Sequence, residues 1–174
     1  MTAGLRRPLL VTGPPAVGKS QTAEALARAR PRAAYIDVDD IRQLVVAGAE
    51  ASWRGSEGAA QGDLGAANAC ALARNFIDAG FEVTIADVLT PTTLAVVRTL
   101  LPGCLVVRLV VDFAEAQRRA ATRQVWLTEE EFRHLHERDR TSPPSADIDL
   151  DVTALSLDDQ RRAVEDLWRE ASTS

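Results

Sequence analysis

Short apolar runs and longer amphipathic segments follow one another along this 174-residue chain. Runs of four to eight apolar residues are typical of buried strands, whereas apolar residues spaced three and four apart are typical of helices. The pattern predicts strands over 7–12, 33–38, 81–86, 104–111 and 147–152. It predicts helices over 21–30, 41–47, 64–79, 91–101 and 157–170, and two more that begin after Asp112 and at Thr128.

Strands that alternate with helices predict an α/β fold, a three-layer sandwich with a five-stranded parallel sheet and helices on both faces. The nearly continuous apolar run 104–111 is typical of a central strand that is covered on both sides. No linker or repeat divides the chain, so we expect a single domain over 1–174.

The stretch from Gly48 to Gly65 breaks this regular pattern. It is rich in Gly, Ala and Ser and has weak periodicity, so we expect it to be a loop. Long loops in compact α/β domains are often functional, which makes this stretch a candidate binding region.

The composition limits the possible partners. The formal net charge is −5, which disfavours a nucleic-acid partner, because a broad nucleic-acid surface needs a basic surplus. Cys70 and Cys104 lie in apolar segments and are expected to be small buried thiols of a reducing compartment. No signal pattern and no long apolar span occurs, so we expect a cytoplasmic protein without a membrane segment.

The segment Gly13-Pro14-Pro15-Ala16-Val17-Gly18-Lys19-Ser20 joins the first expected strand to the first expected helix. Its spacing, G-x-x-x-x-G-K-S, is that of the phosphate-binding loop (Walker A), whose backbone N–H groups hold phosphates. The lysine reaches the outer phosphates, and the serine hydroxyl ligates Mg²⁺. We therefore expect nucleotide contacts at Gly13, Pro14, Pro15, Ala16, Val17, Gly18, Lys19, Ser20 and Gln21.

Lys19 is the only lysine in the chain, and every other basic side chain is an arginine. Lysine and arginine are not interchangeable inside a tight glycine loop, where a compact ammonium is needed. A GTPase switch would carry a further lysine in its N-K-x-D base-recognition motif, so this class is excluded. Arginines are then the other cations available to the phosphates.

Carboxylates stand at the ends of two expected strands. If the second strand continues through Asp39, the side chains of Asp37 and Asp39 point to the same side, at the sheet edge where ligands bind. A kinase needs one carboxylate to deprotonate the acceptor hydroxyl and another near Mg²⁺. We favour catalysis for Asp39 and helix capping for Asp40. Asp87 ends the third strand and could be a Mg²⁺ or substrate ligand, or could make a structural hydrogen bond.

Three arginines could meet an anion, and a fourth could line a substrate pocket. Arg118, Arg119 and Arg123 lie on one expected helix, where guanidinium groups could neutralise a transferred phosphoryl group. We expect two of them to do so and the third to pair with a surface glutamate. Arg42 and Trp53 could line a substrate pocket, with the tryptophan stacked on a ring. Core packing is the open alternative for Trp53.

The histidines and the other tryptophans suggest no further chemistry. His134 and His136 fall on different faces of a helix, and no ligand cluster accompanies them, so we assign no metal role. Trp126 and Trp168 are expected to be packing residues.

With these motifs the chain resembles the small P-loop kinases of the nucleoside-monophosphate-kinase-like group. Its element order is similar to that of shikimate, gluconate and chloramphenicol phosphotransferase-like kinases. In that family the second aspartate of a D-x-D pair is the base for the acceptor hydroxyl and the first assists Mg²⁺, which implies these roles for Asp39 and Asp37. Shikimate itself is disfavoured, because Ile85-Ala86-Asp87-Val88 stands where a shikimate-type glycine triplet would be.

The resemblance also implies a division of labour within the domain. The region of about 39–65 would bind the acceptor. The region of about 118–130 would form a lid that closes on ATP, with Arg119 and Arg123 touching phosphates. The backbone from about Thr153 to Leu155 would contact the adenine.

We therefore expect ATP-dependent phosphorylation, assisted by Mg²⁺, of a hydroxyl group on a small metabolite, natural product or antibiotic. The expected catalytic residues are Lys19, Asp39, Arg119 and Arg123, and the expected acceptor-binding residues are Asp39, Arg42, Trp53 and Asp87. A nucleoside or nucleoside-monophosphate kinase is the alternative among enzymes. An ATP-binding regulatory protein with slow hydrolysis is the alternative of another class.

Overall fold

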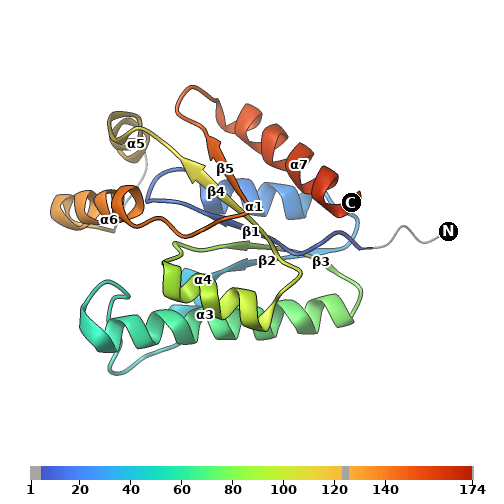
Figure 1. The fold of residues 1–174 in the computed structure, drawn as a ribbon, viewed down its shortest axis with the longest axis horizontal. Coiled ribbons are helices and arrows are strands. Elements are labelled where there is room, and N and C mark those ends of the chain that lie inside the picture. The colour runs from blue at the N-terminus through green and yellow to red at the C-terminus, as the bar shows by residue number, and fades with distance from the viewer. Residues whose placement is uncertain (1–4, 123–125, 174) are drawn as a thin grey trace.

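The computed structural model describes residues 5–122 and 126–173, which build one five-stranded sheet (Figure 1). Every pair of neighbouring strands is parallel, which confirms the predicted α/β class. The strand order is β2-β3-β1-β4-β5. The strands are β1 (Leu9–Thr12), β2 (Ala33–Asp37), β3 (Glu82–Ala86), β4 (Leu105–Val110) and β5 (Ile148–Asp151).

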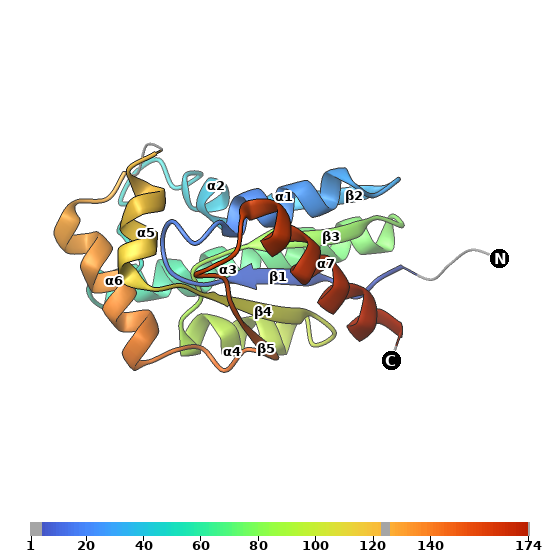
Figure 2. The same cartoon turned by 90° about the horizontal axis from the view of Figure 1, so that it is seen from above.

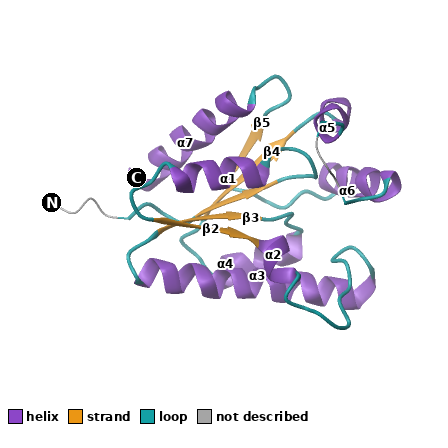
Figure 3. Cartoon of the chain, turned by 180° about the vertical axis from the view of Figure 1, so that it is seen from behind, coloured by secondary structure: helices purple, strands orange, loops and turns teal. Residues whose placement is uncertain are grey.

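Helices cover both faces of this sheet. Figures 1 and 3 show α1 and α7 on one face and α3 and α4 on the other. Figure 2 shows α5 and α6 beyond one end of the strands. The helices are α1 (Lys19–Arg28), α2 (Val38–Arg42), α3 (Gly55–Asp78), α4 (Pro91–Leu100), α5 (Phe113–Ala120), α6 (Glu129–Thr141) and α7 (Leu157–Thr173). Within the described ranges, none of these helices is long and apolar enough to span a bilayer.

Alternation along β1 divides the core between the two faces. Leu9 and Val11 pack with α1 and α7, where Trp168 is fully buried, as the sequence predicted. Leu10 points the other way and packs with α3 and α4. Burial of large apolar side chains on both faces is the main term that holds the layers together.

Sequence signals placed several helix ends correctly. Gly80 follows α3 with a φ of +81°, a backbone conformation that glycine adopts without strain. Pro91 opens α4, and Thr128 with Glu131 forms the capping box of α6.

The loop predicted from Gly48 to Gly65 is wrong in its second half, because α3 begins at Gly55. Gly58, Gly62 and Gly65 are spaced four and three residues apart and therefore share one helix face. A Cβ atom on Gly58 would lie 2.0 Å from the carbonyl oxygen of Ala51. Close packing of the preceding segment on this face outweighs the poor helix propensity of glycine.

The end of the second strand also differs from the prediction. β2 stops at Asp37, whose carboxylate accepts the backbone N–H of Asp39 at 3.0 Å and caps α2. The capping role expected for Asp40 therefore belongs to Asp37. α2 ends at Arg42, so the helix expected over 41–47 lies earlier and is shorter.

Candidate functional site

The phosphate-binding loop runs from the end of β1 to the start of α1. Gly13 and Gly18 have φ values of +136° and +96°, and Ala16 is also left-handed at +63°. A Cβ atom on Gly13 would lie 2.4 Å from the carbonyl oxygen of Leu109, so only glycine fits there. Gly18 caps α1 without a side-chain hydrogen bond, which leaves the N–H groups of the first turn to hold an anion.

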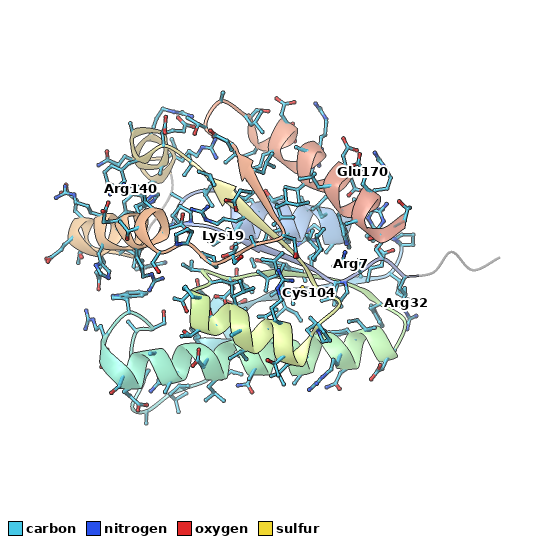
Figure 4. The ribbon with its side chains drawn as sticks, viewed as in Figure 1. Arg7, Lys19, Arg32, Cys104, Arg140 and Glu170 are labelled. Atoms are coloured by element: carbon cyan, nitrogen blue, oxygen red, sulfur yellow. The ribbon has the colours of Figure 1, made fainter. Side chains whose placement is uncertain are left out.

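Lys19 lies at this helix start, with its Nζ donating to the carbonyl oxygen of Pro14 at 2.9 Å. Figure 4 shows Lys19 toward the end of the sheet where α6 lies, whereas Arg7 and Arg32 lie at the opposite end. The loop itself is held by Gln160 of α7, which the sequence did not single out. Gln160 is fully buried, and its amide donates to the carbonyl oxygen of Val17 and to the hydroxyl of Thr22.

A cleft of about 270 Å³, here called the edge cleft, lies beside the loop. Three residues predicted from the sequence to contact the nucleotide line it, Ala16, Gln21 and Arg119. Thr153 does not line it, because the Thr153 hydroxyl accepts the backbone N–H of Asp112 and the lining starts at Leu155. The other lining residues are Glu115, Arg118, Thr122, Ser156 and Leu157.

The Arg119 side chain is held by hydrogen bonds to several parts of the protein. Its guanidinium donates to Glu115, to the carbonyl oxygen of Val17 at 3.2 Å and to that of Val152 at 2.7 Å. It therefore joins α5 to the phosphate loop and to the segment after β5. Arg118 pairs with Glu115, as expected of one arginine in the group. Arg123 lies outside the described residues.

Tyr35 links the two residues expected at a Mg²⁺ ion. Its hydroxyl donates to the Asp37 carboxylate at 2.7 Å, and burial raises the pKa of Tyr35, an effect that a hydrogen bond with Ser20 opposes. Ser20 and Asp37 thus lie on either side of one hydroxyl. A serine hydroxyl and one carboxylate, completed by water and phosphate oxygens, fit the donor set that Mg²⁺ prefers. Within the described ranges, no cluster of three or more His, Cys, Asp or Glu could hold a metal by itself.

Three of the predicted acceptor-site residues form one network. Arg42 donates to Asp39 at 2.8 Å and pairs with Asp87 at 2.8 Å. The Asp87 side chain is 1% exposed, and burial raises its pKa, against the opposing charge of Arg42. Asp39 is 72% exposed and lies in the first turn of α2 rather than on a strand. The expected same-side alternation with Asp37 is therefore wrong, although Asp39 still lines a cleft.

That cleft, here called the inner cleft, has a volume of about 390 Å³. It brings together the phosphate loop, through Lys19 and Ser20, with Asp39 and Trp53 from the acceptor region. The remaining lining residues are Pro15, Ala16, Arg42, Ser52, Val88, Trp126, Leu127, Leu135 and Arg138.

A larger cleft of about 890 Å³, here called the large cleft, lies over α2, α3 and the segment between them. It shares Asp39, Arg42, Ser52, Trp53 and Trp126 with the inner cleft. The packing role predicted for Trp126 is wrong, because this side chain is 86% exposed and lines both clefts. An isolated tryptophan in a sequence gives no sign of whether its neighbours cover it.

Sequence analysis also missed Arg138 on α6. Its guanidinium lines the inner cleft with Lys19, and burial lowers its pKa. Of the arginine side chains in the described ranges, that of Arg138 alone has no hydrogen-bond or ion-pair partner.

Two neighbours on α6 hold the helix that carries Arg138. His136 is buried, and its Nε2 lies 3.0 Å from the carbonyl oxygen of Pro15 in the phosphate loop. Asp139 pairs with Arg108, a buried arginine within β4. The one charge inside the apolar run 104–111 was the signal that could have revealed this anchor, because a buried charge needs a partner.

Comparison with known proteins gives structural matches but no sequence-level family. No protein-family model matches the chain, and no curated protein matches its sequence. Among solved structures, a sugar kinase from Janibacter sp. HTCC2649 matches with a TM-score of 0.73 at 16% identity, over 96% of each chain.

Two further solved structures match over nearly their whole length. Shikimate kinase from Acinetobacter baumannii, solved with shikimate, has a TM-score of 0.65 at 19% identity, over 98% of this chain and 97% of its own. The tunicamycin resistance protein of Deinococcus radiodurans has a TM-score of 0.66 at 14% identity, over 93% of this chain and 95% of its own. The chain therefore has the fold of the small P-loop kinases.

Proposed function

We propose that the protein is an ATP-dependent kinase that transfers the γ-phosphoryl group to a hydroxyl group on a small molecule. The inner cleft carries this proposal, because Lys19 and Ser20 of the phosphate loop and the carboxylate of Asp39 line one cavity. A phosphate donor on the loop and an acceptor beside Asp39 would meet in that space, and such positioning is much of what phosphoryl transfer requires.

Binding of the phosphate donor, ATP, depends on the phosphate-binding loop and on the side chains that hold the loop in place. The free N–H groups at the start of α1 would hold the β- and γ-phosphates, with Lys19 and Arg138 as the cations that face them. Arg119 and Gln160 would keep the loop in its curled form through their bonds to the Val17 carbonyl oxygen. The edge cleft beside Arg119 is the space available for the rest of the nucleotide.

Activation of the acceptor hydroxyl group depends on Asp39. Its carboxylate would take the proton of the acceptor hydroxyl while that oxygen forms a bond to the γ-phosphorus and the bond from phosphorus to the bridging oxygen of ADP breaks. Arg42 holds one oxygen of Asp39 in place. A Mg²⁺ ion held by Ser20 and Asp37 would neutralise negative charge on the β- and γ-phosphates.

The arginine network disfavours the nucleoside-monophosphate kinase alternative. Such an enzyme needs arginines for the phosphate of its acceptor. Arg42, the arginine nearest Asp39, is held between the carboxylates of Asp39 and Asp87.

The test is to incubate the full chain with ATP and Mg²⁺ and a broad panel of hydroxyl compounds, and to detect products heavier by one phosphoryl group by mass spectrometry. The Lys19→Ala variant should lose on the order of 10²–10³ in turnover while remaining folded. If ATP raises the melting temperature and no compound is phosphorylated, the regulatory alternative is correct instead. If no nucleotide raises the melting temperature of the protein, the proposed binding of ATP is wrong.

A further inference from the structure

We propose that the acceptor is an uncharged hydroxyl compound with an apolar body that lies in the large cleft. This inference rests on the proposed function and adds the chemical class of the substrate.

The lining is largely apolar and continuous with the inner cleft. Trp53 and Trp126 line both clefts, so a molecule between them would extend from the large cleft to Asp39. The other apolar side chains of the large cleft are Ile41, Val45, Ala49, Ala51 and Leu64. Aromatic and aliphatic walls of this kind bind an apolar body by removing its surface from water.

Exposed apolar side chains gather around the same opening. Of the eight large hydrophobic residues exposed in the described ranges, Leu64 and Trp126 line the cleft. Leu44 and Val46, which are 75% and 95% exposed, flank its lining residue Val45. Contiguous exposed apolar surface at the mouth of a cleft is typical of a binding site.

The charges of the cleft oppose an anionic acceptor. Among the lining residues that the structure describes, Arg42 is the one basic side chain, and two carboxylates already hold its guanidinium. Asp39 and Glu50 add negative charge to the lining. A carboxylate or phosphate on the acceptor would lose water here without gaining a free cation, which is costly.

Positive charge lies instead in the inner cleft, beside the phosphate-binding loop. Lys19 and Arg138 line the inner cleft and do not line the large one. A neutral acceptor would leave both cations to the transferred phosphoryl group, whereas an anionic acceptor would compete for them.

Contacts within the chain hold the walls of the cleft together. The Gln61 amide donates to the carbonyl oxygen of Gly48 and accepts the N–H of Glu50, which fixes the wall on α3. Gly58 allows that wall to approach closely at Ala51. A preformed apolar site binds without the cost of ordering a loop.

Uncharged polar side chains of the lining, Gln43, Ser52 and Asn68, are available to orient the bound body. Their amide and hydroxyl groups can donate to a carbonyl or hydroxyl oxygen on the acceptor, and a few such groups in an apolar pocket fix the orientation of what it binds.

The test measures binding rather than turnover, so that it is independent of phosphoryl transfer. The full chain, with Mg²⁺ and a non-hydrolysable ATP analogue, is titrated with cyclohexanedimethanol or hydroxymethylcyclohexanecarboxylate. This pair differs only in that a hydroxymethyl group is replaced by a carboxylate. Fluorescence of Trp53 and Trp126 reports the cleft, since Trp168 is fully buried elsewhere. We expect the neutral member to bind at least about tenfold more tightly, the equivalent of one unpaired polar group.

Matched variants on α3 test where the preference arises. Leu64→Lys places a cation in the cleft and should reduce the preference by roughly three- to tenfold. Leu72→Lys changes an exposed leucine of the same helix that does not line the cleft, and should leave the preference unchanged.

The outcomes separate this inference from the proposed function. Equal binding of the pair, including no binding of either, or tighter binding of the carboxylate, overturns the neutral-acceptor inference. Equal effects of the two lysine variants overturn the placement in the large cleft. Failure of the proposed function would appear elsewhere, as absence of any phosphorylated product from the panel.

Discussion

Arg138 is the arginine of the site whose proposed role is catalytic rather than structural. Other described arginines of the site, such as Arg42 and Arg119, are neutralised by carboxylates or bound to backbone oxygens. Arg138 lines the inner cleft without such a partner. A half-buried guanidinium beside a phosphate loop contributes little to stability, but it can neutralise charge that develops during phosphoryl transfer.

Replacing Arg138 with alanine should therefore reduce kcat by on the order of 10²-fold, with an almost unchanged melting temperature. Steady-state kinetics and thermal unfolding measure the two effects. Arg140→Ala is the matched control on the same helix, because Arg140 is exposed and pairs with Glu137. A similar loss of kcat in both variants, or in neither, would count against a role for Arg138 at the phosphoryl group.

At the scale of elements, α3 shows how a glycine-rich stretch can form a helix. Gly58, Gly62 and Gly65 present a face without side chains to the 42–52 segment. The helix depends on this contact more than on its own propensity, and the contact shapes one wall of the large cleft.

Gly58→Ala should destabilise the protein by about 1–3 kcal/mol, although alanine is the better helix former, because the new Cβ would meet the carbonyl oxygen of Ala51. Urea unfolding measures this, and the acceptor KM should rise more than the ATP KM. Gly103→Ala is the control, since a Cβ there has nothing within 4 Å. If Gly58→Ala stabilised the protein instead, the segment around Ala51 would have moved away from the new Cβ atom at no cost in stability.

The α6 helix meets the phosphate loop through His136, and this contact should depend on pH. Burial lowers the pKa of His136 below its ordinary value of 6.5, so the unfolded chain binds the proton more readily. Stability from this site is therefore present above about pH 6.5 and is lost as the pH falls below it.

Unfolding free energies at pH 7.5 and 5.5 test this sign, because the chain has only two histidines. His136→Gln should weaken the pH dependence, whereas His134→Gln should keep it, since His134 is exposed. An unchanged pH dependence in His136→Gln would mean that other groups titrate in this range.

At the scale of the whole molecule, the sequence predicted what local pattern and spacing determine. The alternation of apolar runs with helical segments gave the parallel sheet, and G-x-x-x-x-G-K-S gave the loop at the end of β1. Arg138 and Trp126 could not be found this way, because their exposure depends on how α6 and the segment before it pack on the rest of the fold. Asp39 was placed beside the clefts for an incorrect reason, the continuation of a strand that ends at Asp37.

The two clefts differ in charge, because different charged residues line them. The inner cleft carries Lys19 and Arg138, and the large cleft carries Asp39, Glu50 and the neutralised Arg42. Asp39 lies where the two clefts join, so its carboxylate would lie between the phosphate donor and the acceptor.

The most direct measurement is the turnover of Asp39→Asn and Asp40→Asn with ATP, Mg²⁺ and an acceptor from the phosphorylation panel. The two aspartates are adjacent and exposed on α2, but only Asp39 lines the clefts. If Asp39 is the base, Asp39→Asn loses about 10²–10⁴ in kcat while Asp40→Asn stays within a few-fold of the parent. Near-normal turnover of a folded Asp39→Asn variant would contradict the account.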